Sequence, residues 1–198
     1  MQGTVISVKP ADKKGSAVKI ELSFGGEKRI YTVSEGTYRE IGCPLSDELI
    51  DADSLELLEK EHRRRCAMKK ALNILAYADN NSKNLYRKLL TAGFSREEAS
   101  ITVKECIRLG YIDEERQLER LIIGLWERDL LGPSRIYAKL CSKGYNPSQV
   151  SAVMGRLRQG GEIDFGKSRR ALIEKKMPET YEERQKILYK YGYKNETD

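Results

Sequence analysis

The sequence contains no long apolar run. No stretch of roughly 20 apolar residues occurs, so we expect no membrane-spanning segment and no membrane partner. Residues 1–5 also lack the basic and then apolar layout of a secretory signal peptide. We therefore expect a cytoplasmic protein.

Cysteine and histidine are scarce, with 4 and 1 among 198 residues. Cys43, Cys66, Cys106 and Cys141 form no Cys-x-x-Cys pair, and the spacing therefore predicts no zinc site. Thiols in the cytosol should be reduced. Cys106 and Cys141 fall on apolar faces of predicted helices, which favours burial as small apolar side chains.

A catalytic set of residues is missing as well. His62 has no evident nucleophile or carboxylate partner. The acidic pairs at 97–98 and 114–115 fall in the predicted first turns of helices, where the helix dipole favours negative charge. Gly25-Gly26 is typical of a turn, because no Lys-Ser or Lys-Thr follows it as in a phosphate-binding loop. We predict no enzyme, no catalytic residue, no metal site and no cofactor.

Charge is plentiful and unevenly divided along the chain. Residues 1–61 contain 8 Lys and Arg against 12 Asp and Glu, a net charge of −4, whereas residues 62–198 contain 28 against 18, a net charge of +10. A basic surface favours polyanions such as nucleic acid, or an acidic protein face. A solvated surface with surplus lysine is the alternative interpretation.

The N-terminal part predicts strands. Apolar and polar residues alternate from Val18 to Phe24, the period of a half-buried strand, and Gly25-Gly26 predicts a hairpin turn after it. Residues 30–33 predict the return strand and residues 4–8 a third strand. A short helix is expected at 34–42. No glycine or proline interrupts residues 53–78, which predict one long helix or two in line.

The most informative feature is an internal repeat. Residues 81–113 read NSKNLYRKLLTAGFSREEASITVKECIRLGYID. Residues 132–164, shifted by 51 positions without a gap, read GPSRIYAKLCSKGYNPSQVSAVMGRLRQGGEID. Each copy predicts two helices that end at glycine, since the left-handed residue after a helix is most easily glycine. Ser95 and Glu98 predict a capping box, and Asp113 is placed to cap a third helix.

These patterns predict a mainly α fold of tandem three-helix repeats in an elongated, curved array, with a small N-terminal antiparallel β-sheet subdomain. Repeats of this kind bury their apolar faces by stacking on neighbours. The segment 188–193 (LYKYGY) echoes 140–145 (LCSKGY) and indicates a third, truncated repeat. The predicted parts are a β-rich subdomain at 1–52, a first repeat with a long leading helix at 53–113, a second repeat at 114–164 and a truncated third repeat at 165–198.

Three passages of the sequence resemble the RecX regulatory family. They are Gly93-Phe94 before a capped helix, residues 110–114 (GYIDE), which look like a family signature, and residues 131–136 (LGPSRI), which are similar to the family's segment before the second-unit helix. The resemblance covers nearly the whole chain and agrees with the register of 51. It implies a regulator of the RecA recombinase. Such proteins dock along the groove of the RecA filament on single-stranded DNA and limit filament growth, ATP hydrolysis and strand exchange.

Basic side chains recur along the predicted helices. A repeat array that presents charges at regular intervals suits a regularly repeating partner, such as a filament or a phosphate backbone. We predict that a basic face binds RecA or DNA. The predicted binding residues are Arg63, Arg64, Lys70, Lys83, Arg87, Lys88, Arg135, Lys139, Arg156, Arg158, Lys167, Arg169 and Arg170.

A second hypothesis is a basic helical-repeat DNA-binding protein or transcription regulator. Short capped helices joined by glycine turns imitate helix-turn-helix units, which place one helix in the major groove of DNA. Single- or double-stranded DNA is therefore a further expected partner. We expect a monomer under both hypotheses.

Overall fold

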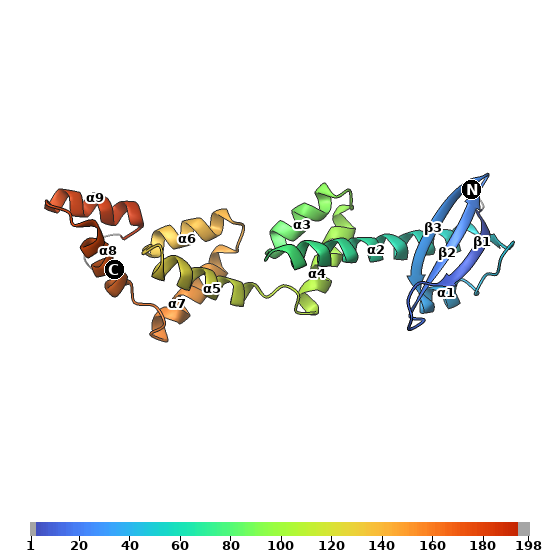
Figure 1. Cartoon of the computed structure of the whole chain (residues 1–198), viewed down its shortest axis with the longest axis horizontal. Coiled ribbons are helices and arrows are strands. Elements are labelled where there is room, and N and C mark those ends of the chain that lie inside the picture. The colour runs from blue at the N-terminus through green and yellow to red at the C-terminus, as the bar shows by residue number, and fades with distance from the viewer. Residues whose placement is uncertain (1–2, 194–198) are drawn as a thin grey trace. The chain divides into compact units, whose positions relative to one another are not determined.

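The computed structural model describes residues 3–193 of the chain (Figure 1). Residues 1–2, and residues 194–198 of the predicted third repeat, lie outside this description. The described chain forms two compact units, residues 3–77 with 86–106 and residues 78–85 with 107–193. In chain order the elements are β1 (Gly3–Pro10), β2 (Ala17–Phe24), β3 (Glu27–Ser34), α1 (Glu35–Glu40), β4 (Leu49–Ile50), α2 (Ala52–Tyr77), α3 (Ser82–Thr91), α4 (Arg96–Arg108), α5 (Glu114–Glu127), α6 (Pro133–Ser142), α7 (Pro147–Gln159), α8 (Phe165–Lys176) and α9 (Tyr181–Tyr191).

The first unit begins with a four-stranded antiparallel sheet in the order β3-β2-β1-β4. Phe24 pairs with Glu27 across the turn at Gly25 and Gly26, which both have positive φ, as a two-residue hairpin requires. The predicted small sheet, short helix and long helix are confirmed. The two-residue strand β4 was not predicted.

Helix α2 packs on the buried face of the sheet. Leu58 of α2 is fully buried in one apolar cluster with Ile20 and Val33 of the sheet. Two hydrogen bonds also join strand β3 to helix α2. The Thr32 N–H of β3 donates to His62 Nδ1 of α2 (2.9 Å), and the Tyr31 hydroxyl donates to Glu59 Oε1 (3.3 Å). The single histidine thus satisfies a backbone donor of strand β3.

The helices repeat in the predicted register. Helices α6 and α7 begin and end 51 positions after α3 and α4, and α9 begins 48 positions after α6. The buried positions recur with the same shift. Fully buried pairs are Leu85 and Ile136, Leu89 and Leu140, Ala99 and Val150, and Cys106 and Leu157. The predicted repeat of short capped helices is therefore confirmed, whereas the domain boundaries drawn from it stay a prediction.

The two cysteines expected to be buried differ in exposure. Cys106 is fully buried, as predicted, and burial raises the pKa of its thiol. Cys141 is only half-buried on α6. The buried residues of α6 are Ile136 and Leu140.

The second unit is built around one apolar core with two buried tyrosine hydroxyls. Tyr145, which follows α6, donates from its hydroxyl to Gln117 Oε1 on α5 (3.0 Å). Tyr193, 48 positions later, lies 2.8 Å from the Ser168 hydroxyl on α8 and donates to the Leu130 carbonyl (3.1 Å). Burial raises the pKa of both phenols, and each therefore stays protonated near neutral pH.

Successive first helices of the repeats meet end to end within the second unit. The Gly132 N–H, just before α6, donates to the Tyr191 carbonyl at the end of α9 (2.8 Å), and the Ser134 hydroxyl donates to the Gly192 carbonyl (2.6 Å). At the equivalent earlier position, the Asn81 and Asn84 side-chain amides donate to the Lys143 carbonyl (3.0 and 3.1 Å). The unpaired carbonyl groups of a helix C-terminus are thereby satisfied by the chain one repeat earlier.

Two glycines allow this close approach. Gly192 has a φ of +92°, and a Cβ built on it would lie 2.5 Å from the backbone nitrogen of Arg135. A Cβ on Gly132 would lie 2.6 Å from the Gly192 carbonyl oxygen. The backbones of α6 and the α9 terminus are therefore in direct contact.

We predict that Gly192→Ala destabilises the protein well beyond Gly161→Ala. Gly161 also has a positive φ of +75°, but open space surrounds its Cβ position, so this control carries only the left-handed backbone cost, about 1–2 kcal/mol. Gly192→Ala adds a backbone clash, which costs about 1–3 kcal/mol more. Urea denaturation measures both variants. Equal free energies of unfolding would show that the close approach contributes nothing.

Candidate partner-binding surface

The predicted basic residues lie on both units of the structure. All of them are exposed except Arg169, which is half-buried. Arg63, Arg64, Lys70, Arg87 and Lys88 belong to the first unit, and the others belong to the second. The structure therefore presents two separate groups of cations, each on its own unit.

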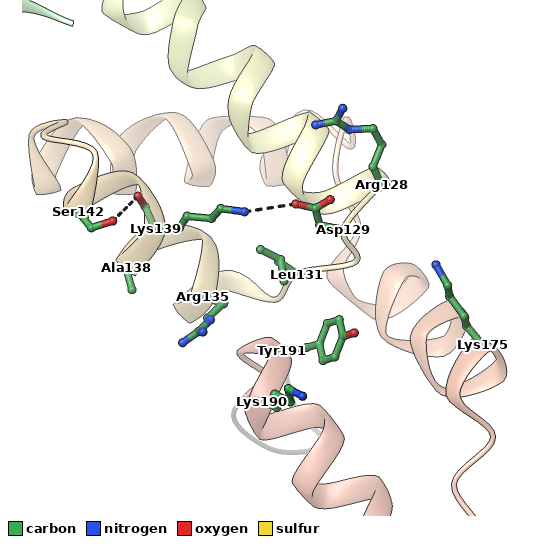
Figure 2. Close-up of a pocket in the computed structure, with 10 residues that line it drawn as sticks. All are labelled: Arg128, Asp129, Leu131, Arg135, Ala138, Lys139, Ser142, Lys175, Lys190 and Tyr191. Atoms are coloured by element: carbon green, nitrogen blue, oxygen red, sulfur yellow. Dashed lines mark hydrogen bonds and ion pairs between the residues drawn. The ribbon is translucent and has the colours of Figure 1, made fainter. Parts of the chain in front are cut away.

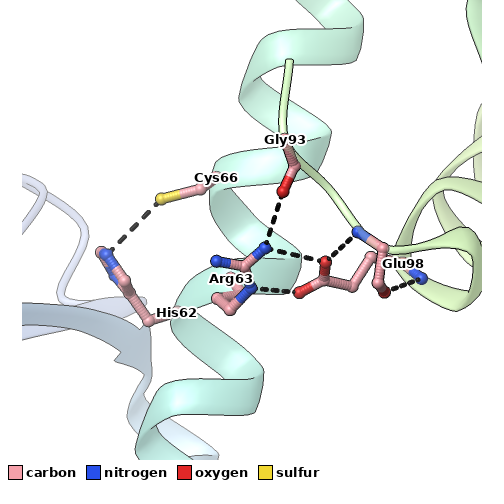
Figure 3. A network of polar contacts seen from close by, with 6 residues as sticks. His62, Arg63, Cys66, Gly93 and Glu98 are labelled. Carbon is pink, nitrogen blue, oxygen red and sulfur yellow. Dashed lines mark hydrogen bonds and ion pairs between the residues drawn. The ribbon is translucent and has the colours of Figure 1, made fainter. Parts of the chain in front are cut away.

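Arg63 has a structural role in the first unit (Figure 3). Its guanidinium on α2 binds both carboxylate oxygens of Glu98 on α4, with N–O distances of 2.5 and 3.0 Å, and also donates to the Gly93 carbonyl (3.3 Å). The guanidinium also stands 5.8 Å from the centre of the Phe94 ring. A bidentate pair of this kind fixes the angle between two side chains. Arg63 therefore joins α2 to the start of α4.

Glu98 binds Arg63 and also caps the start of α4. The Ser95 N–H donates to the Glu98 carboxylate (2.7 Å), and the Glu98 N–H donates to the Ser95 hydroxyl (3.2 Å), which is the predicted capping box. The hydrogen bonds from Arg63 are the main cause that lowers the pKa of the Glu98 carboxyl to about 2, and those from Ser95 add to it.

We predict that Glu98→Gln removes an acid-sensitive part of the stability. A carboxyl whose pKa falls from 4.5 to about 2 on folding stabilises the protein above about pH 4.5, and that stability is lost as the pH falls toward 2. Because Arg63 is half-exposed, the effect near neutral pH should be about 1 kcal/mol. Urea denaturation from pH 7 to pH 3 should show the gap between wild type and Glu98→Gln closing. Glu97→Gln, on an exposed neighbour, is the control, and a gap that stays constant would contradict the assignment.

Two other predicted residues also have acidic partners. Arg156 on α7 pairs with Glu119 and with Glu115 (3.3 Å), both on α5. The Lys139 ammonium of α6 lies 3.4 Å from the Asp129 carboxylate. Exposed pairs such as these contribute little to stability, and they reduce the net positive charge offered to a partner.

Arg135 and Lys139 lie together at a basic hollow of the second unit (Figure 2). The hollow has a volume of about 770 Å³ and is bounded by the C-terminal end of α5, α6, α8 and α9. Arg128, Lys175 and Lys190 also line it, and Asp129 is its one carboxylate. None of these three cations was predicted as a binding residue, because they come from three distant segments and match no periodic spacing. We call this site the basic hollow.

A smaller hollow of about 180 Å³ lies between α8 and α9. Arg169 and Arg170, both predicted binding residues, line it together with Arg184. The Arg184 Nε is buried without a hydrogen-bond partner among the described residues. The structure therefore brings two predicted residues together here, whereas Lys83, Arg158 and Lys167 line neither hollow.

Curated proteins with similar sequences share one name. The regulatory protein RecX of Trichlorobacter lovleyi is 28% identical over 136 residues, which cover 64% of this chain and 86% of the relative. The regulatory protein RecX of Stenotrophomonas maltophilia is 26% identical over 131 residues, covering 66% and 77%. The chain is therefore similar to RecX regulatory proteins over about two thirds of its length. No protein-family model matches it.

Solved RecX structures share the fold. One crystal structure of regulatory protein RecX has a TM-score of 0.72 at 18% identity and covers 97% of this chain and 95% of its own. RecX from Lactobacillus salivarius has a TM-score of 0.54 at 19% identity and covers 65% and 85%. These likenesses confirm the predicted mainly helical fold with a small N-terminal antiparallel sheet.

The described part of the chain, residues 3–193, lacks two features. No three His, Cys, Asp or Glu side chains lie close enough to hold a metal ion in that part of the chain. None of its helices is both long and apolar enough to cross a membrane.

Proposed function

We propose that this chain is a RecX family member that binds the RecA recombinase filament on single-stranded DNA and limits filament growth, ATP hydrolysis and strand exchange. The observation that carries the proposal is the likeness to relatives named regulatory protein RecX. Regulation of this kind needs binding and no chemistry, so we expect no enzymatic activity. We also expect a cytoplasmic monomer.

The second unit offers a surface that suits such a partner. Its exposed cations stand on consecutive helices, with Arg135 and Lys139 on α6, Arg158 on α7 and Arg170 on α8. A filament on DNA presents negative charge at regular intervals, and lysine and arginine that neutralise phosphates release counterions. These cations support a contact whose strength falls as the salt concentration rises.

We predict that the purified protein lowers the single-stranded-DNA-dependent ATPase rate of RecA. The rate is measured at a fixed RecA concentration while the protein is added up to one copy per RecA. A loss of at least about half of the rate is expected near stoichiometry. An unchanged rate at that dose would contradict the proposed function.

We also predict that the double variant Arg135→Glu with Lys139→Glu binds RecA filaments at least about tenfold more weakly. A tenfold loss of affinity corresponds to about 1.4 kcal/mol, and reversing two charges in a contact costs more than that. The matched control is Arg116→Glu with Lys186→Glu, two exposed cations of the same unit that line neither hollow. Circular dichroism should show the same helical signal for both variants. Equal affinities of the two variants would remove Arg135 and Lys139 from the interface.

A DNA titration separates the rival hypothesis. A basic transcription regulator would bind one duplex sequence tightly, with half-sites at a defined spacing. A RecA regulator should show salt-dependent binding that does not depend on sequence. Tight binding to one duplex sequence would favour the rival.

A further inference from the structure

The basic hollow concentrates positive charge in one place of the second unit. Five cations and one carboxylate line it, so its lining has a formal charge of +4. Lys139 and Asp129 (3.4 Å) form the one salt bridge that the described contacts of these lining residues include. Like charges that share a concave surface repel each other, and an anion bound between them relieves that repulsion.

The fold itself does not require these cations. Their side chains are exposed, and the core of the second unit is made by other residues. The equivalent positions one repeat earlier are neutral for four of the five cations. A shift of 51 pairs Arg128, Arg135 and Lys175 with Tyr77, Asn84 and Gly124, and the shift of 48 pairs Lys190 with Ser142. Lys139 alone has a cation, Lys88, at its equivalent position, so most of the positive charge belongs to the basic hollow and does not recur with the repeat.

The frame of the hollow is fixed by backbone contacts. Arg135 stands on the α6 turn that is in direct contact with Gly192, next to Lys190 and Tyr191. The N–H groups at the start of α6 cannot hold an anion, because Gly132 and Ser134 donate theirs to the Tyr191 and Gly192 carbonyls (2.8 and 3.3 Å). A ligand must therefore be held by the lysine and arginine side chains.

The wall of the hollow is partly apolar. Leu131, Ala138 and Tyr191 also line it, and Leu131 and Tyr191 lie among the charged side chains (Figure 2). A volume of about 770 Å³ lies within the range of small-molecule sites, which is about 300–1,000 Å³. An occupant with a highly charged part and a less polar part would use both surfaces.

We propose that the basic hollow binds a chain of linked phosphates, as carried by a nucleoside triphosphate. A triphosphate has about four negative charges near neutral pH, because its last phosphate titrates near pH 6 as phosphate monoesters do. That charge balances the lining of +4. Charges that surround one concave space suit a compact ligand better than an extended strand. Binding of a triphosphate does not depend on the proposed function, because it is expected of the purified protein in the absence of RecA.

Isothermal titration calorimetry tests the proposal on the whole chain in buffer free of divalent cations. ATP, inorganic tripolyphosphate, AMP and adenosine are titrated in separate experiments. ATP and tripolyphosphate should bind, AMP should bind at least about tenfold more weakly because it lacks two phosphates, and adenosine should not bind. Tighter binding of ATP than of tripolyphosphate identifies the nucleotide as the source, and equal binding identifies the phosphate chain alone.

Two variants assign the binding to the basic hollow. Arg135→Glu with Lys190→Glu should weaken ATP binding at least about tenfold, since each lost charge-assisted contact is worth more than one factor of ten. Arg135→Gln with Lys190→Gln repeats the test without new negative charge, in case charge reversal disturbs the α6–α9 junction. The control Arg116→Glu with Lys186→Glu should leave binding unchanged.

Three outcomes would overturn the proposal. ATP and tripolyphosphate could both fail to bind, or all variants could bind them equally. In the third outcome, a single-stranded oligonucleotide titrated in the same way binds the wild type and not the Arg135 and Lys190 variants, while ATP binds neither. The hollow would then be a contact for a nucleic-acid backbone.

Discussion

Hydrogen bonds between helix ends determine how successive helices meet in the second unit. The carbonyl groups that close α9 and α6 accept hydrogen bonds from chain segments one repeat earlier, at Gly132 and at Asn81. Each contact satisfies groups that a helix end leaves unpaired and sets the position of the next helix. The contact at Gly192 is tightest, because only glycine leaves room for the Arg135 backbone. The basic hollow lies beside this contact, since Arg135 lines it.

The basic side chains have different roles, which depend on the groups that they contact. Arg63 is part of the architecture, since it holds the Glu98 carboxylate and the Gly93 carbonyl. Arg156 is balanced by two glutamates of α5. The cations at the basic hollow outnumber their one carboxylate. A basic sequence therefore contains side chains with unlike roles, and the surplus of positive charge available to a partner is smaller than the composition suggests.

Local features were predictable from the sequence, because their causes are local. The capping box at Ser95 and Glu98 and the turn at Gly25-Gly26 follow from neighbouring residues, and the shift of 51 follows from comparing two segments of the sequence. The partners of Arg63 were not predictable, nor was the placement of Lys175 and Lys190 on one hollow, because both depend on how distant helices pack. Strand β4 was also missed, since two residues show no periodicity. The identity of the binding residues stays a prediction.

Co-sedimentation with RecA tests most directly the proposed binding of this RecX-like protein to RecA filaments. RecA is assembled with and without single-stranded DNA, and the filaments are pelleted in the presence of the purified protein. The proposed function predicts that the protein pellets with RecA on DNA in a saturable ratio and stays in the supernatant without RecA. Protein that remains in the supernatant at every RecA concentration, in low salt and with DNA present, would contradict it.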